Sequence, residues 1–219
     1  MDVKLAKVTG PHKNARVLAN GNTKDPKQAV LLFHGRGSSG ENIMRAVHHV
    51  RLPEDAIALA PTAHGNTWYP ERFLVERTRN EPHLSSALEV VRDLLAFCAD
   101  GYHIPSSRIT LAGFSQGACL ISDFAANFTR AFKGLCIWSG GLIGSDKDIR
   151  ASTWRGALKK TPVYIGCDEQ DSHIPAERVK ETARILALHG ANVSLKLYKG
   201  LGHAVDEEGY QFLDSILNN

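Results

Sequence analysis

The stretch Ile109-Thr110-Leu111-Ala112-Gly113-Phe114-Ser115-Gln116-Gly117-Ala118 has the pattern of a short apolar strand, a serine between two glycines and the start of a helix. Its centre matches G-x-S-x-G, in which a sharp turn from strand to helix presents a serine hydroxyl as a nucleophile. Short motifs also arise by chance, and a serine in front of a helix is often only an N-cap residue. The rest of the chain has to decide between these two interpretations of Ser115.

Composition limits the classes of protein to consider. The chain has 219 residues, 43% of them hydrophobic and 22% charged, with a net charge of +3, which is ordinary for a soluble globular protein. No basic run exceeds Lys159-Lys160, so we expect no nucleic-acid partner. Apolar runs fall far short of the ~20 residues that span a bilayer, so we expect no stable membrane insertion. Met1-Asp2-Val3-Lys4 lacks the apolar core of a signal peptide, which favours a cytoplasmic protein.

The four cysteines do not form a pattern typical of metal sites or disulfide frameworks. No two of them have C-x-x-C spacing, and each lies within an apolar segment. We therefore expect buried, reduced thiols, no metal site and no disulfide. These cysteines are Cys98, Cys119, Cys136 and Cys167.

Unbroken apolar runs recur along the chain and predict strands that are covered on both faces. Between them lie helical patterns, the clearest of which has apolar residues at steps of three and four from Leu84 to Cys98 and ends at Gly101. This alternation predicts an α/β fold with a mostly parallel, doubly wound sheet, helices on both faces and one domain over residues 1–219. The strands predicted from the apolar runs are Ala29–Phe33, Ala56–Ala60, Arg108–Phe114, Gly134–Trp138 and Pro162–Gly166. A further strand, Val193–Tyr198, is predicted from an alternating pattern, which is typical of a half-exposed strand near the sheet edge.

Several element boundaries follow from local signals. Val3–Val8 and Ala15–Ala19 predict an antiparallel hairpin at the sheet edge. Ser38 and Glu41 have the spacing of a capping box, and Pro61 should end its strand. The remaining predicted helices are Ala118–Ala131, a helix with Pro175 at its first position, and Val205–Leu217.

The predicted strand ends carry the groups that a nucleophilic serine needs. A serine hydroxyl requires a base, and the base requires an acid that orients it, in the chain order Ser, Asp or Glu, His. His203 follows the last strand in a glycine-rich turn and is the preferred base, with His173 as its rival. Asp168 and Asp171 both follow a strand, and spacing does not separate them, whereas Glu169 is the weakest candidate acid.

The loop after Phe33 should complete the site. In this architecture the oxyanion hole uses the N–H after the nucleophile and one from an earlier strand-end loop, which are those of Gln116 and Arg36. The Arg36 side chain could meet an anionic substrate group or point to solvent, and His34 should be structural. The aromatic residues of the segment 62–82 could wall a substrate pocket or only pack the loop. They are Trp68, Tyr69 and Phe73.

Four motifs together resemble the phospholipase/carboxylesterase family of α/β-hydrolases, which includes acyl-protein thioesterases and bacterial carboxylesterases. The resemblance covers residues 29–217 and implies the α/β-hydrolase fold, with Ser115 as nucleophile, His203 as base and Asp171, from a D-x-x-[VI]-P motif, as acid. The motifs are Leu32-Phe33-His34-Gly35-Arg36-Gly37, Gly113-Phe114-Ser115-Gln116-Gly117, Asp171-Ser172-His173-Ile174-Pro175 and Gly200-Leu201-Gly202-His203.

Two departures bear on the substrate. Acyl-protein thioesterases usually carry H-G-L-G-D where this chain has His34-Gly35-Arg36-Gly37-Ser38, and Gly65-Asn66-Thr67-Trp68-Tyr69-Pro70 is more similar to the bacterial carboxylesterase branch. We therefore expect a serine carboxylesterase acting on a small-molecule ester, without metal or organic cofactor. The alternatives are an acyl thioesterase or lysophospholipase with the same triad, and an inactive ligand-binding hydrolase fold. A homodimer stays an open alternative for the assembly.

Overall fold

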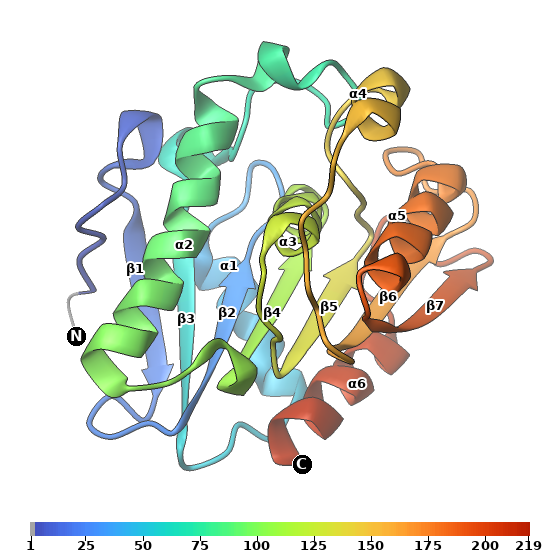
Figure 1. The fold of residues 1–219 in the computed structure, drawn as a ribbon. Coiled ribbons are helices and arrows are strands. Elements are labelled where there is room, and N and C mark those ends of the chain that lie inside the picture. Colours follow the sequence, from blue (N-terminus) through green and yellow to red (C-terminus); the bar gives the residue numbers. More distant parts are fainter. Residues whose placement is uncertain (1–2) are drawn as a thin grey trace.

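Seven strands form one sheet in the order β1-β3-β2-β4-β5-β6-β7 in the computed structural model, which describes residues 3–219 (Figure 1). β1 runs antiparallel to β3, and every other neighbouring pair is parallel. The predicted mostly parallel sheet is therefore confirmed. The strands are β1 (Arg16–Gly21), β2 (Gln28–Phe33), β3 (Ala56–Thr62), β4 (Ile109–Phe114), β5 (Gly134–Trp138), β6 (Pro162–Asp168) and β7 (Asn192–Tyr198).

Helices cover both faces of the sheet, as the alternating pattern predicts (Figure 1). Successive side chains of a strand point to opposite faces, so Leu31 and Phe33 enter one core and Val30 and Leu32 the other. The first core includes side chains of α2, α3 and α5, and the second those of α1 and α6. The helices are α1 (Gly40–Met44), α2 (His83–Tyr102), α3 (Gln116–Asn127), α4 (Asp146–Ala151), α5 (Ala176–Leu188) and α6 (Glu207–Asn218).

The predicted N-terminal hairpin is wrong. Residues 3–8 form no strand, and β1 pairs with β3 instead. The backbone of this segment is bound by α2: the N–H of Lys7 donates to Asp93 Oδ2 at 2.9 Å, and that of Thr9 to Glu89 Oε2 at 2.7 Å. Side-chain carboxylates thus take the place of a strand partner. Met1 and Asp2, which contribute to the expectation of no signal peptide, lie outside the described residues.

Two predicted boundaries shift because of contacts that the sequence does not reveal. Ser39, not Ser38, caps α1 and accepts from the N–H of Asn42 at 3.3 Å, because the N–H of Ser38 closes a turn onto Gly35. β3 continues through Pro61, which faces β1, because the pairing of β3 with β2 ends before this proline.

The helix ends differ from the predictions by one to four residues. α2 runs past Gly101 to Tyr102, α3 begins at Gln116 and ends at Asn127, and Pro175 is the N-cap of α5 rather than its first residue. α4 is absent from the sequence-based prediction, although its N-cap Ser145 and its third residue Asp148 form a capping box.

Gly113 and Gly117 allow β4 and α3 to approach each other closely. A Cβ at Gly113 would lie 2.7 Å from the carbonyl carbon of Gly117, and a Cβ at Gly117 would collide with the carbonyl oxygens of Phe33 and His34. The obstacles are backbone atoms, which cannot rotate away as a side chain can. Steric contact with the backbone therefore explains why both positions are glycine.

We expect Gly113→Ala to lower the free energy of unfolding by about 1–3 kcal/mol, because the added methyl group overpacks the crossing. Urea denaturation followed by circular dichroism measures this. Gly101→Ala is the matched control, since a Cβ there meets nothing within 4 Å. In the helix it should stabilise by up to about 1 kcal/mol. Equal unfolding midpoints for the two variants would contradict the steric explanation.

Candidate active site

Ser115 lies at the junction of β4 and α3 in a strained backbone conformation, with φ 54° and ψ −117°. A positive φ is costly for a residue with a Cβ and needs support from its surroundings. Its N–H donates to the carbonyl of Trp138 at 2.9 Å, and its own carbonyl accepts from Cys119 at 2.9 Å. The turn therefore holds Ser115 at the carboxyl edge of the sheet, in front of the helix.

The structure brings Ser115, His203 and Asp171 into one hydrogen-bonded chain. His203 Nε2 lies 2.8 Å from Ser115 Oγ, and His203 Nδ1 lies 2.7 Å from Asp171 Oδ2. The side chain of Asp171 is fully buried and that of His203 is 21% exposed. An ionised Asp171 only accepts, so it fixes the proton of a neutral His203 on Nδ1 and leaves Nε2 free to accept from the serine hydroxyl.

Asp171 is held in place through its second oxygen. Oδ1 accepts the N–H of His173 at 2.8 Å and that of Ile174 at 3.1 Å. These bonds close the turn between β6 and α5 around the carboxylate and direct Oδ2 to His203. His173, the rival base, is exposed, and its ring packs edge-on against that of His203 at a centroid distance of 4.8 Å.

Asp168, the competing acid, contacts the loop that carries His203 rather than its imidazole. One carboxylate oxygen accepts from the N–H groups of Leu201 at 2.5 Å and Gly202 at 3.0 Å. The other oxygen accepts from the N–H of Gln170 at 2.8 Å. These backbone donors, Gln170 first, hold the pKa of Asp168 below its usual value. Asp168 is thus a clamp on the histidine loop, a role that the sequence analysis missed.

His34 and Trp68 lie behind the site, not in its wall. His34 is fully buried; Nδ1 donates to the Gly35 carbonyl at 2.7 Å, and Nε2 accepts from the N–H of Ala63 at 3.0 Å. Burial lowers its pKa and favours this neutral form. Trp68 donates to the His34 carbonyl at 2.9 Å and lies outside the cavity. Of the two alternatives that the sequence left open for this residue, packing of the loop agrees with its position, because its indole fills the core beneath the loop.

The Arg36 side chain follows neither of the two predicted alternatives. Its guanidinium donates to the carbonyls of Tyr69, Pro70 and Glu71 at 3.0, 2.8 and 2.5 Å. It thereby fixes the segment that forms one wall of the cavity. Five donors on a planar group suit such a contact with several carbonyls.

The Gln116 side chain binds the same wall from the other side. Its Oε1 accepts the N–H of Trp68 at 2.8 Å, and its Nε2 donates to the carbonyl of Tyr69 at 2.8 Å. The sequence predicts a role only for the backbone N–H of Gln116, as an oxyanion donor, and no local pattern reveals this side-chain contact. Within residues 3–219, the N–H groups of Gln116 and Arg36 have no protein acceptor. Gln116 is the first residue of α3, where an N–H lacks an intrahelical partner.

A cavity of about 580 Å³ opens in front of Ser115 and His203. Tyr69 and Phe73 line it, as does the exposed Arg72. The other lining residues are Gly35, Arg36, Ser38, Pro70, Glu71, Phe114, Gln116, Cys119, His173 and Ile174.

The four cysteines are buried and free, as the sequence predicts. Burial raises the pKa of Cys98 and that of Cys119 to about 12, so neither is an activated thiolate. In the part of the chain that the structure describes, no three His, Cys, Asp or Glu side chains are arranged to hold a metal ion. No helix among residues 3–219 has the length and apolar character that a membrane span requires.

The mixed sheet, the serine turn and the hydrogen-bonded Ser–His–Asp chain are those of an α/β-hydrolase. Residues 13–219 match the family described as phospholipase/carboxylesterase, and the chain belongs to that family of serine carboxylic ester hydrolases. The crystal structure of a phospholipase/carboxylesterase from Dyadobacter fermentans is similar, with a TM-score of 0.87 and 32% identity over 94% of this chain and 97% of that one.

Curated relatives of two kinds are similar in sequence. Acyl-protein thioesterase 1 of Gibberella zeae is 35% identical over 82% of this chain and 85% of its own length. A probable carboxylesterase of Oryza sativa subsp. japonica is 28% identical over 87% of this chain and 76% of its own. The comparisons thus show the family and its hydrolytic chemistry, and the relatives include both a carboxylesterase and a thioesterase.

The low pKa of Asp168 gives its contribution to stability a definite pH dependence. The group stabilises the fold above its unfolded pKa of about 3.9, and this contribution is lost as pH falls through the lower folded value. Asp168→Asn should therefore lower the melting temperature at pH 7, and the difference from wild type should shrink below about pH 4. Asp100→Asn, on the exposed surface of α2, controls for the loss of one charge. A difference that does not depend on pH would contradict the clamp.

Proposed function

We propose that the protein is a serine carboxylesterase in which Ser115 is the nucleophile, His203 the general base and Asp171 the acid that orients it. The observation that carries the proposal is the unbroken chain of 2.7 and 2.8 Å hydrogen bonds from Asp171 through His203 to Ser115. In this geometry Nε2 takes the hydroxyl proton while Oγ attacks the ester carbonyl. Asp171 then stabilises the imidazolium that forms.

The N–H groups of Arg36 and Gln116 form the oxyanion hole in this proposal. Both residues line the cavity beside Ser115, and neither N–H has a protein acceptor among the described residues. Donors that are already oriented stabilise the developing negative charge without reorganisation. His203 next protonates the leaving alcohol, and an acyl group remains on Ser115. Water, activated by the same histidine, then releases the acid and restores the serine.

Each step uses only side chains, backbone N–H groups and water, so the proposal includes no metal or organic cofactor. Tyr69 and Phe73 are the proposed substrate-binding residues, because both line the cavity in front of Ser115. Residues 1–219 act as one hydrolase domain in this proposal, in keeping with the family match over 13–219.

Thioester hydrolysis is the second candidate, because the relative from Gibberella zeae is named an acyl-protein thioesterase. The same triad would serve, since a thiolate leaves more readily than an alkoxide. Steady-state kinetics on short-chain aryl esters, long-chain acyl thioesters and lysolipids separate the candidates. We expect the highest kcat/KM for the short-chain esters. Higher kcat/KM for the long-chain thioesters would overturn the choice of ester.

We expect Ser115→Ala, His203→Gln and Asp171→Asn each to lower kcat by about 10⁴-fold or more, because the three groups act as one unit. Wild type should also react with a fluorophosphonate probe, with the label on Ser115 in the digested protein. Ser172→Ala is the control, since this residue is an exposed neighbour of the triad acid and does not line the cavity. It should keep most of the activity. A wild-type protein that neither labels nor hydrolyses any of these substrates would contradict the proposed function.

A further inference from the structure

A second cavity borders α3 one turn beyond the cavity in front of Ser115, and an ion pair lies in its wall. It has a volume of about 280 Å³ and a mixed wall, in which Leu88, Phe124 and Phe128 are the apolar side chains. Cys119 lines the first cavity and Asp123 the second; the two residues are one turn apart on α3 and share a face of that helix. The lining residues of the second cavity are Arg77, Leu88, Arg92, Asp123, Phe124, Asn127, Phe128 and Thr129.

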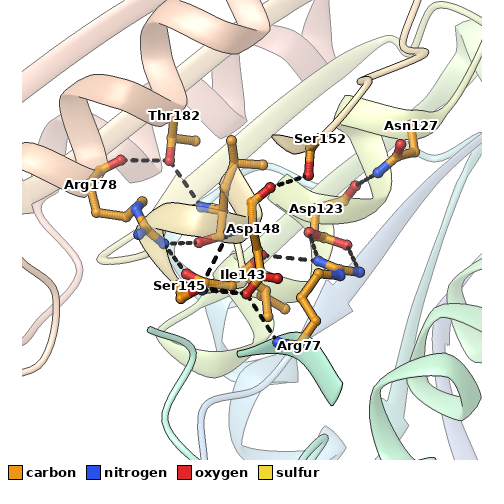
Figure 2. A network of polar contacts seen from close by, with 11 residues as sticks. Arg77, Asp123, Asn127, Ile143, Ser145, Asp148, Ser152, Arg178 and Thr182 are labelled. Carbon is orange, nitrogen blue, oxygen red and sulfur yellow. Dashed lines mark hydrogen bonds and ion pairs between the residues drawn. The ribbon is translucent and has the colours of Figure 1, made fainter. Parts of the chain in front are cut away.

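The ion pair in the wall of the second cavity joins Arg77 to Asp123. Nη1 and Nη2 of Arg77 contact the two carboxylate oxygens at 2.5 and 3.0 Å, and Nη1 also donates to the Ile143 carbonyl at 3.0 Å. The Asp123 side chain is 1% exposed and that of Arg77 28%. Figure 2 shows the guanidinium and the carboxylate face to face, with both dashed contacts between them.

Further hydrogen bonds hold the backbone around this pair. The N–H of Arg77 donates to Asp148 Oδ2 at 3.2 Å, and Asp148 is part of the capping box of α4 (Figure 2). The N–H of Gly144 donates to the carbonyl of Phe73 at 2.7 Å, which ties the cavity wall to the same loop. Three parts of the chain therefore meet at this ion pair: helix α3, the segment that carries Arg77, and the loop before α4.

Tyr69 connects the catalytic cavity with the surroundings of the pair. It lines the first cavity and is buried, and burial raises its pKa well above the usual range, with smaller contributions from Cys119 and Asp123. Tyr69 thus lies near both the catalytic cavity and Asp123. One turn beyond Cys119 on α3, the next side chain on this face is the charged Asp123, the partner of Arg77.

The direction of the substrate follows from the chemistry of the triad. The leaving alcohol must lie near Nε2 of His203 to receive its proton, and the carbonyl oxygen must point to the N–H groups of Arg36 and Gln116. The acyl chain takes the remaining direction, away from His203 and toward Tyr69, Phe73 and Cys119. It therefore points at the Arg77–Asp123 pair.

We propose that the Arg77–Asp123 ion pair closes the acyl pocket and restricts the enzyme to short acyl chains, an inference that rests on the proposed esterase function. A longer chain would have to separate the pair and leave a buried charge without its partner, which is strongly unfavourable. The second cavity is the space that such a chain would otherwise occupy. Arg77 and Asp123 are specificity-determining residues in this proposal and take no part in the chemical steps.

Two double variants test the proposal, because they lose the same polar contacts and differ only in volume. Arg77→Ala with Asp123→Ala opens a passage to the second cavity, whereas Arg77→Met with Asp123→Leu keeps it filled. Replacing both partners avoids an unpaired buried charge. The substrates are p-nitrophenyl acetate, butyrate, hexanoate, octanoate and decanoate, measured as kcat/KM for wild type and both variants.

We expect wild-type kcat/KM to rise by about fourfold for each methylene group that the pocket buries. The wild-type kcat/KM should reach its maximum at an ester shorter than octanoate and should be lower for octanoate. The opened variant should continue to rise through octanoate, and the filled variant should keep the wild-type order. Thermal unfolding of each protein shows that the variants are folded.

If the kcat/KM of wild type rises through decanoate, that result alone overturns the proposal, whatever the variants show. Identical profiles for the opened variant and wild type also overturn it and leave the esterase function intact. If wild type hydrolyses none of the esters, the proposed function and the pocket fail together.

Discussion

The close crossing of β4 and α3 is the constraint on which the rest of the site depends. Only glycine fits at 113 and 117, because backbone atoms of the helix and of β2 occupy the places where a Cβ would lie. The crossing forces Ser115 to a φ of 54° and starts α3 at the next residue. It also presses the start of α3 against the end of β2, so that the loop carrying Arg36 lies beside Ser115. One steric contact thus sets both the serine and the two N–H groups that we propose as its oxyanion donors.

The sequence predicted the features that follow from the order of strands and helices along the chain. Unbroken apolar runs predicted five of the strands and an alternating run predicted β7. In a parallel sheet the carboxyl ends of the strands lie at one edge, so Ser115 and His203 were expected there. The choice of Asp171 over Asp168 came from the resemblance, because spacing left both open. The structure explains why: Asp168 is the last residue of β6 and faces the histidine loop, whereas a turn carries Asp171 to the imidazole.

The sequence could not predict contacts between distant segments. Val3 and Val8 have the pattern of a strand, yet they pack against α2, whose carboxylates bind the backbone beside them. Trp68 lies next to Tyr69 in the chain, but it is directed into the core, and no periodicity exists in an irregular segment to reveal which side faces the cavity. Arg36 is a loop arginine whose acceptors lie 33 to 35 positions further along the chain. In each case tertiary contacts decide an outcome that local patterns leave open.

Arg36 and Gln116 connect the pocket wall to the proposed oxyanion hole. Their side chains bind the backbone of residues 68–71, and their N–H groups have no protein acceptor among residues 3–219. This wall segment forms no regular secondary structure, so its position depends on those side-chain contacts. A substrate that shifts this wall segment therefore also shifts Arg36 and Gln116, whose N–H groups would bind its oxyanion. The fit of the substrate against the wall and the stabilisation of its transition state are then parts of one interaction.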